Sequence, residues 1–363
     1  MLFAVDRAGV TRRNGMPIDP KLKLDEYSLV TTRLMKKHAA SSEETVDADE
    51  LRNSAAQLAL ILDLAYQAFA GHKPAGLTVD RLAGRLHKLR RQVAPAVWQK
   101  LVPLAQQHRV AEYLIQDPFT RWSVEKPRGY SGDAGLLDIY YKHPAADDTV
   151  ASSTLLGRQI YAYTSDAASS VAGRERRDIL ARTVDETAGR VEKAEILAIA
   201  CGHLREAERS DALAKRKLQR WIGLDQDPVS VATVNNDFAG TAVEAIHGSV
   251  RGILRRAYAL GTFDLVYASG LYDYLPRAIG VRLLQRAMEL VKPGGEFLFA
   301  NFSNEITTDG YMETFMDWPL ILRSADDMRD IIDAALGGSS FEAHVYYGSN
   351  RNIVYGKVRR GDL

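Results

Sequence analysis

The spacing of apolar residues divides the chain into a helical first part and a second part in which strands alternate with helices. Between residues 48 and 70, apolar side chains such as Leu51, Leu58 and Phe69 recur near helical spacing, which predicts an amphipathic helix. Similar patterns predict helices over residues 27–37, 78–92, 95–109, 155–164 and 169–189. Residues 1–24 and 39–47 lack such a period, so we expect them to be irregular.

From residue 196 onward, short apolar runs end in glycine or acid. Residues 196–200 form one run, which is followed by Gly202, and residues 221–224 form another, which ends at Asp225. Residues 204–217 between them are rich in good helix formers. The order strand, glycine turn, helix, strand is typical of a parallel sheet. Further along, the patterns predict a helix, a strand, a helix and a closing hairpin over residues 228–238, 242–246, 279–290, and 341–347 with 353–355.

The acid at the end of the second run indicates a ligand. Asp225 comes 23 positions after Gly202. A glycine turn lets a ligand approach the backbone, and a carboxylate accepts hydrogen bonds from the two hydroxyls of a ribose. The alternative is an ordinary strand–helix–strand unit with a solvated acid. The full dinucleotide pattern is absent, because Ala200 and Leu204 occupy positions where it has glycine, which leaves a smaller nucleoside as the expected ligand.

Residues 111–141 break the helical pattern of the first part. They contain Pro-Arg-Gly-Tyr-Ser-Gly-Asp at positions 127–133, which is a poor helix sequence. Arg128, Tyr130 and Asp133 bring together charge, hydroxyl and flexible backbone. We therefore expect a structured loop that contacts the ligand, the alternative being a connector between domains.

Composition excludes several classes of partner. A net charge of +1 over 363 residues gives no support for nucleic-acid binding. No apolar stretch is long enough to span a membrane, and the first residues do not form a signal peptide. The single cysteine, Cys201, excludes an internal disulfide and fits a cytoplasmic location. No Cys or His pattern indicates a metal. A role in packing is favoured for Cys201 over a nucleophilic one.

Four motifs in order resemble class I S-adenosylmethionine-dependent methyltransferases. They are Ala-Cys-Gly-His-Leu-Arg-Glu-Ala at 200–207, Gly-Leu-Asp-Gln-Asp-Pro at 223–228, the segment 263–276, and the segment 291–301 with its Lys-Pro-Gly-Gly turn. The first motif departs from the common form, since Ala198 replaces its usual acid. The segment 127–133 is similar to one in a bacterial subgroup linked to fatty-acid methyl ester signals, and the overall pattern is also similar to azetidine-2-carboxylate synthases of the same fold.

The resemblance implies an α/β, Rossmann-like fold: a mostly parallel sheet with a C-terminal antiparallel hairpin, and an N-terminal helical lid. It implies a lid and substrate domain over 1–165 and a cofactor domain over 166–363. S-adenosylmethionine is the expected cofactor and a small molecule the expected substrate, while the oligomeric state stays open. The residues expected to bind the cofactor are Arg128, Ala200, Gly202, Arg205, Asp225, Gln226, Gly248, Ser249, Val250, Ser269, Gly270 and Tyr272.

The same resemblance leaves the reaction open. Tyr130, Asp133 and Asn301 are the expected catalytic residues, with Tyr130 near the sulfonium. The first hypothesis is methyl transfer to a small or acyl substrate. The second is cyclisation of S-adenosylmethionine itself to azetidine-2-carboxylate with release of methylthioadenosine, which the lack of an evident general base favours. The third is a module that binds the cofactor without catalysis. Residues 311–323 are expected to form either a core helix or a wall of the substrate pocket.

Overall fold

The computed structural model describes residues 47–337 and 341–361. The irregular segment expected over 1–24 and the helix predicted over 27–37 lie outside the described residues. Among the residues described, no helix is both long and apolar enough to cross a membrane.

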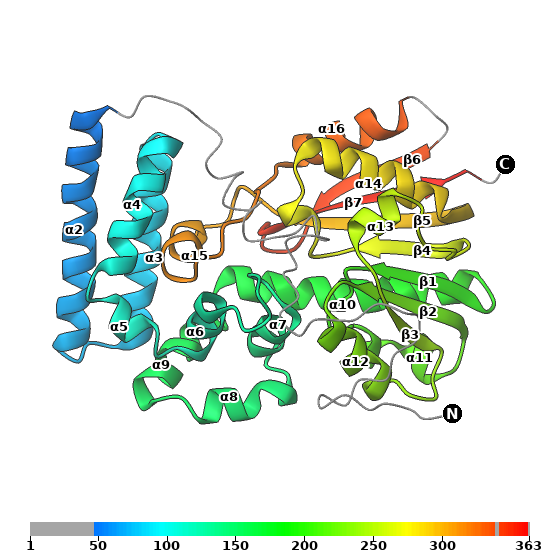
Figure 1. Cartoon of the computed structure of the whole chain (residues 1–363), viewed down its shortest axis with the longest axis horizontal. Coiled ribbons are helices and arrows are strands. Elements are labelled where there is room, and N and C mark those ends of the chain that lie inside the picture. The colour runs from blue at the N-terminus through cyan, green and yellow to red at the C-terminus, as the bar shows by residue number, and fades with distance from the viewer. Residues whose placement is uncertain (1–46, 338–340, 362–363) are drawn as a thin grey trace, which may run out of the picture.

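A bundle of helices occupies one end of the molecule. Its members are α2 (Ala48–Ala70), α3 (Ala75–Gln92), α4 (Pro95–Gln107) and α15 (Asp309–Phe315). Helices α2 and α3 pack through buried leucines such as Leu58, Leu62 and Leu86. Helix α15, from far along the chain, packs on α3 and α4, and Figure 1 shows this group opposite the strands. The expected start of α3 at Thr78 is wrong: Pro74 precedes the first turn, and the Thr78 hydroxyl donates to the Pro74 carbonyl inside the helix.

The segment 111–141 is mostly helical, so the expectation of a loop over its whole length is wrong. Its helices, and those that follow it, are α5 (Ala111–Leu114), α6 (Pro118–Glu125), α7 (Ala134–Tyr141), η2 (Pro144–Ala146), α8 (Asp147–Ala151), α9 (Leu155–Thr164) and α10 (Ala168–Arg190). Pro118 occupies the first turn of α6, where proline is tolerated. Asp117 and Asp133 cap α6 and α7. Only residues 126–133 remain irregular.

The cap of α6 provides a test of this local structure. The buried Asp117 carboxylate accepts from the amides of Phe119 and Thr120, both at 3.1 Å, and from the Thr164 hydroxyl at 3.0 Å. Asp117→Ala is expected to lower the free energy of unfolding by about 2–3 kcal/mol, because buried donors lose their acceptor. Denaturant unfolding measures this. Asp47→Ala is the control, since Asp47 caps α2 from an exposed position and should cost only about 0.5–1 kcal/mol. Equal losses would contradict a special role for the buried cap.

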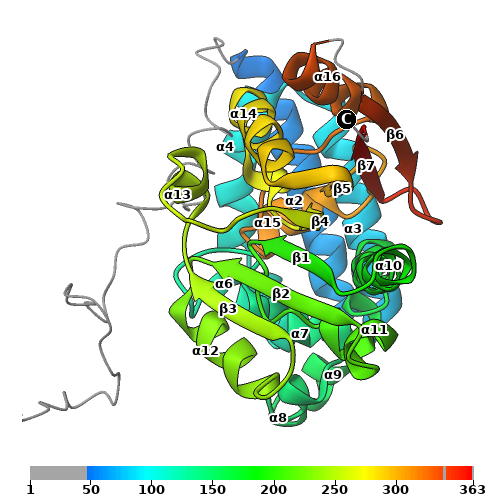
Figure 2. The ribbon, with the colours of Figure 1, turned by 90° about the vertical axis from the view of Figure 1, so that its right-hand side faces the viewer.

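A seven-stranded sheet forms the other end of the molecule, in the order β3-β2-β1-β4-β5-β7-β6. The strands are β1 (Ala194–Ile199), β2 (Leu218–Asp225), β3 (Val243–His247), β4 (Phe263–Ala268), β5 (Val291–Phe302), β6 (Phe341–Tyr347) and β7 (Ile353–Arg360). The first five pair in parallel, while β7 pairs antiparallel with both β5 and β6. Figure 2 shows β3, β2, β1 and β4 following one another across the sheet. The predicted fold, with a helical first part and a closing hairpin, is confirmed.

Helices and short turns connect the strands of the sheet. They are α11 (Asp211–Ala214), α12 (Pro228–Asp237), α13 (Val250–Leu254), α14 (Arg277–Glu289) and α16 (Ala325–Leu336), with the short turns η3 (Ala207–Arg209) and η4 (Tyr272–Tyr274). Helix α10 packs against β1, β4 and β7, and α14 packs against β5 and α16. Residues 292–295 interrupt the pairing of β4 with β5.

The continuous helix predicted over 204–217 is wrong. Only η3 and α11 are helical there. Leu204 has a left-handed backbone with φ of +52°, which a right-handed helix does not contain. Ser210 then caps α11, and its hydroxyl donates to Asp185 of α10. Good helix formers therefore did not decide the structure, because the turn after β1 fixes the path of the chain.

Candidate functional site

A pocket lies at the carboxyl ends of β1, β2, β3 and β4, the edge where open α/β sheets bind ligands. It contains about 860 Å³ of empty space, open solvent included, within the range of small-molecule sites. Residues from three sources line it, namely the loops after these strands, the segment 130–141, and α10. They are Tyr130, Gly132, Ala134, Leu137, Asp138, Tyr141, Arg176, Ala200, Cys201, Gly202, His203, Leu204, Arg205, Glu206, Leu224, Asp225, Gln226, Gly248, Ser249, Val250, Ser269, Gly270, Leu271 and Tyr274.

The turn after β1 has an unusual backbone. Gly202 and Ala200 both have φ of +55°, and Leu204 has φ of +52°. The two non-glycine residues therefore adopt the left-handed conformation that glycine favours. A Cβ atom on Gly202 would lie 3.2 Å from the Cβ of Ala134, at the start of α7. The turn is thus held closely between the sheet and the segment above it.

Asp225 fixes this turn from the neighbouring strand. Its Oδ2 accepts from the Gly202 amide and its Oδ1 from the Asp227 amide, both at 2.8 Å. Burial raises the pKa of Asp225, although the two amides act in the opposite direction. Each carboxylate oxygen has a second acceptor site. The side chain can therefore hold the turn and still accept from a ligand in the pocket.

The loop after β3 forms the far end of the pocket. Gly248, Ser249 and Val250 line it, and the Ser249 hydroxyl caps α13 by accepting from the Gly252 amide at 3.2 Å. The Ser249 amide donates to the Tyr258 hydroxyl at 2.9 Å. The expected hydrogen bond from Ser249 to an adenine amino group stays a prediction, and it would use the remaining lone pair of the hydroxyl.

A buried ion network supports the other side of the pocket. Asp138 of α7 accepts from His203 Nδ1 at 2.8 Å and from Arg205 at 2.9 and 3.0 Å. Burial alone would raise the pKa of Asp138, but His203 and Arg205 hold it below its usual value. Arg128 lies 3.3 Å from His203 Nε2 and forms an ion pair with Asp227. The network joins the segment 126–133, α7 and the turn after β1 into one unit.

Four of the expected site residues do not line this pocket. Arg128 pairs with Asp227 instead. Asp133 caps α7 and accepts from the Leu136 amide and the Trp122 indole, both at 2.9 Å. Asn301 is fully buried, donates to the carbonyls of Phe302 and Ile321, and accepts from Arg323. Each of these side chains thus has partners within the protein.

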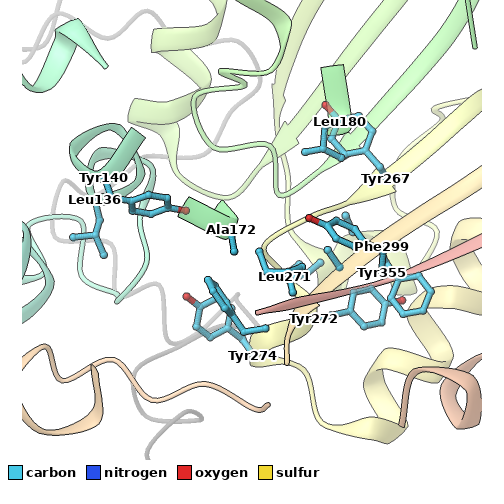
Figure 3. Packing of buried hydrophobic residues seen from close by; sticks show 14 of the residues in the cluster. Leu136, Tyr140, Ala172, Leu180, Tyr267, Leu271, Tyr272, Tyr274, Phe299 and Tyr355 are labelled. Atoms are coloured by element: carbon cyan, nitrogen blue, oxygen red, sulfur yellow. The ribbon is translucent and has the colours of Figure 1, made fainter. Parts of the chain in front are cut away.

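Tyr272 is the fourth, and its neighbour Tyr274 takes the expected place. Tyr272 is fully buried, donates to the Gly280 carbonyl, and packs on Phe299 with ring centroids 4.5 Å apart. Tyr274 lines the pocket instead. Figure 3 shows Tyr274 on the side of Tyr140, and Tyr272 on the side of Phe299. Residues two apart in the tight turn η4 project in different directions, and the sequence does not say which one faces the ligand.

Sequence reasoning missed six polar residues along the pocket, namely Asp138, Tyr141, Arg176, His203, Glu206 and Tyr274. A signal existed for Arg176, because it interrupts the apolar stripe of α10 formed by Ala172, Ile179 and Leu180. Cys201 also lines the pocket, and burial raises the pKa of its thiol well above the usual value. A thiol in that state is a poor nucleophile, in keeping with the packing role.

A second, mainly apolar cavity shares a wall with this pocket. It contains about 490 Å³ of empty space, open solvent included, and lies among α3, α6, α9, α15 and the end of β5. Its lining includes Tyr140, Phe302, Met312, Met316 and Trp318. Residues of the two cavities touch: the Trp318 indole donates to the Tyr274 hydroxyl at 2.8 Å. The Tyr140 hydroxyl lies 3.5 Å from Arg176. We call this space the apolar cavity.

Comparison with known proteins agrees with the fold and the first cavity. The family described as "Methyltransferase domain" matches residues 196–295. No curated protein sequence gives a significant match. Among solved structures, a possible exported protein from Bordetella parapertussis is similar with a TM-score of 0.52 and 16% identity, over 87% of this chain and all of that one. At this identity the likeness concerns the fold alone.

Two methyltransferase structures are similar at lower scores. The N-methyltransferase NodS from Bradyrhizobium japonicum WM9, in complex with S-adenosylhomocysteine, has a TM-score of 0.38 and 15% identity over 54% of this chain and 89% of its own. An S-adenosylmethionine-dependent methyltransferase from Clostridium acetobutylicum has a TM-score of 0.39 and 11% identity over 52% of this chain and 92% of its own.

Proposed function

Because the chain carries a methyltransferase domain of the S-adenosylmethionine-dependent class, we propose that it transfers the methyl group of this cofactor to a small or acyl acceptor. The cofactor occupies the pocket at the strand ends, with its ribose on Asp225 and its adenine by residues 248–250. The acceptor occupies the apolar cavity. The observation that carries this proposal is the contact between the two cavities at Arg176 and Tyr274.

The reaction needs little from the protein beyond alignment. A nucleophilic atom of the acceptor attacks the methyl carbon, the bond from carbon to sulfur breaks, and the electron pair stays on sulfur to give S-adenosylhomocysteine. Holding the two molecules in line and excluding water supplies most of the acceleration. The second cavity is apolar and enclosed by aromatic and methionine side chains, which suits an acceptor with a hydrocarbon part.

The polar groups along the pocket favour an acceptor that is already ionised. His203 is held by Asp138 on one nitrogen and lies against Arg128 on the other. Glu206 accepts from the Tyr267 hydroxyl at 2.6 Å. Among the described lining residues, no histidine or carboxylate is left without a partner to remove a proton. A carboxylic acid needs no such base, because it is ionised at neutral pH.

Product analysis tests the proposal. The protein is incubated with S-adenosylmethionine, alone and with a panel of carboxylic acids and amines of increasing chain length, and the products are measured by mass spectrometry. S-adenosylhomocysteine formed only with an acceptor is the expected result. Methylthioadenosine formed without an acceptor would replace the proposal with cyclisation. Cofactor binding with neither product would identify a binding module.

Tyr130 is proposed to face the methionine end of the cofactor from the segment above the pocket. Its ring lines the pocket, and burial followed by the carboxylates of Asp225, Asp227 and Asp133 raises the pKa of its hydroxyl. We expect Tyr130→Ala to lower turnover about tenfold while cofactor affinity changes little, because alignment of the sulfonium is expressed in the transition state. Steady-state kinetics and cofactor titration measure the two effects.

The control for this variant is Tyr346→Ala, since Tyr346 is an exposed tyrosine on β6 away from the pocket. It should leave both quantities unchanged. Equal losses of turnover and affinity in Tyr130→Ala would reduce the residue to a binding contact. No loss in either would leave it as part of a connector.

A further inference from the structure

Arg176 is a buried charge without adequate partners. It lies on α10 within an apolar stripe and is 3% exposed. Its Nε and Nη1 atoms have no hydrogen-bond partner among the described residues. A guanidinium stays charged at all physiological pH values. Burying its donors without acceptors is unfavourable, so the side chain is arranged for a group that the protein itself does not supply.

The groups around Arg176 do not complete its shell. The Tyr140 hydroxyl lies 3.5 Å from Nη2, at the limit of a hydrogen bond, and is neutral. The nearest carboxylate is Asp273, whose Oδ2 lies 3.8 Å from Nη1, while its Oδ1 accepts from the Phe302 amide. The Glu206 carboxylate, on the same pocket, is engaged by Tyr267. A planar guanidinium binds a carboxylate through two parallel hydrogen bonds, and neither acid provides that here.

The position of Arg176 defines where the missing group must lie. It lines the cofactor pocket beside the loop after β4, where a Cβ on Gly270 would be 3.7 Å from Nη2. It also faces the apolar cavity, because the centroid of the Phe302 ring lies 5.7 Å from its Cζ. The unpartnered atoms therefore stand at the junction of the two cavities.

We propose that Arg176 is the residue that binds a carboxylate group at this junction. The inference rests on the proposed function, since it places an anionic ligand in the same site. Two molecules bring such a group. S-adenosylmethionine carries one on its methionine end, and a carboxylic acid acceptor carries one next to a tail that the apolar cavity accommodates. Both satisfy the same chemistry, and binding experiments distinguish them.

Two pairs of probes test the proposal on the unmodified protein. The first pair is S-adenosylhomocysteine and its decarboxylated analogue, which lacks only the carboxylate. The second pair is decanoate and decanol, titrated with S-adenosylhomocysteine bound. The proposal expects the carboxylate member of at least one pair to bind about 10- to 100-fold more tightly, as a charge-assisted hydrogen-bonded pair does. Calorimetric titration gives each dissociation constant.

Variants then assign the discrimination to Arg176. Arg176→Gln should bring the two members of the discriminating pair to within about twofold, mainly by weakening the carboxylate member. Arg176→Lys keeps the charge and should retain part of the preference. Arg182→Gln is the matched control, because Arg182 is exposed on the same helix, and it should leave all four affinities unchanged. Thermal melts confirm that each variant is folded.

Loss of discrimination in the first pair assigns the site to the cofactor, and loss in the second assigns it to the acceptor. If the unmodified protein discriminates in neither pair, or if Arg176→Gln discriminates as well as the unmodified protein, the proposal is overturned. Equal binding of S-adenosylhomocysteine and its analogue leaves the proposed function intact. A protein that binds neither of them refutes the cofactor assignment, and the second pair alone then decides the role of Arg176.

Discussion

Replacing Gly202 by valine is expected to abolish cofactor binding while the protein remains folded. The residue has φ of +55°, and a Cβ atom there would lie 3.2 Å from Ala134. A β-branched side chain both strains this backbone and pushes the turn away from α7. Because the Gly202 amide also donates to Asp225, the shift moves the ribose-binding carboxylate that we propose. We expect affinity for S-adenosylhomocysteine to fall by at least about two orders of magnitude, or ~3 kcal/mol.

Gly240→Val separates strain from crowding. Gly240 has φ of +79°, a Cβ atom added to it would have no heavy atom within 4 Å, and it lies outside the pocket lining. Its replacement carries the same kind of backbone cost, about 1–2 kcal/mol for a left-handed residue, without touching the turn. Titration calorimetry should find normal cofactor affinity in this control. Cofactor binding that survives Gly202→Val would show that the ligand lies elsewhere.

Asp225→Ala is expected to weaken cofactor binding about 10- to 100-fold. The carboxylate is buried at the end of β2, and removing it takes away charge-assisted hydrogen bonds to the ribose hydroxyls, at about 1.5–3 kcal/mol. The change also leaves the amides of Gly202 and Asp227 without their acceptor. Asp225→Asn keeps one acceptor oxygen, so it should preserve more of the turn and lose less affinity. Titration with S-adenosylhomocysteine measures both variants.

The control for Asp225 is Asp211→Ala, an exposed carboxylate whose partner is Lys215. Its loss should leave cofactor affinity unchanged, which excludes an effect of net charge alone. Unaltered affinity in Asp225→Ala would remove the ribose assignment, whatever happens to stability.

The sequence was informative where one local signal decides the structure. The apolar run before Gly202 and the acid Asp225 predicted adjacent parallel strands, and β1 and β2 pair in that way. The alternating residues after 341 predicted the antiparallel hairpin, because a period of two is typical of strands and does not fit a helix. Helix α2 has the predicted bounds, since Asp47 caps it and its apolar stripe is uninterrupted.

The failures arose where distant contacts override local preference. Residues 204–217 favour helix by composition, yet Leu204 and Asp185 impose a turn there. Of Tyr272 and Tyr274, only packing on Phe299 decides which is core. Arg176 was missed because the sequence shows that α10 has an apolar face but not which cavity that face meets. Contacts between residues far apart in sequence carry this information, and a single sequence does not contain them in readable form.

Helix α15 sets a condition on how the protein is made. It packs on α3 and α4, but about 200 residues separate the end of α4 from its first residue. At roughly 5–20 residues per second on the ribosome, the matching surfaces of α3 and α4 wait about 10–40 s for their partner. During that interval the nascent chain presents unburied apolar side chains. The amino-terminal helices therefore complete their packing only late in synthesis, and chaperone supply is expected to influence the yield of folded protein.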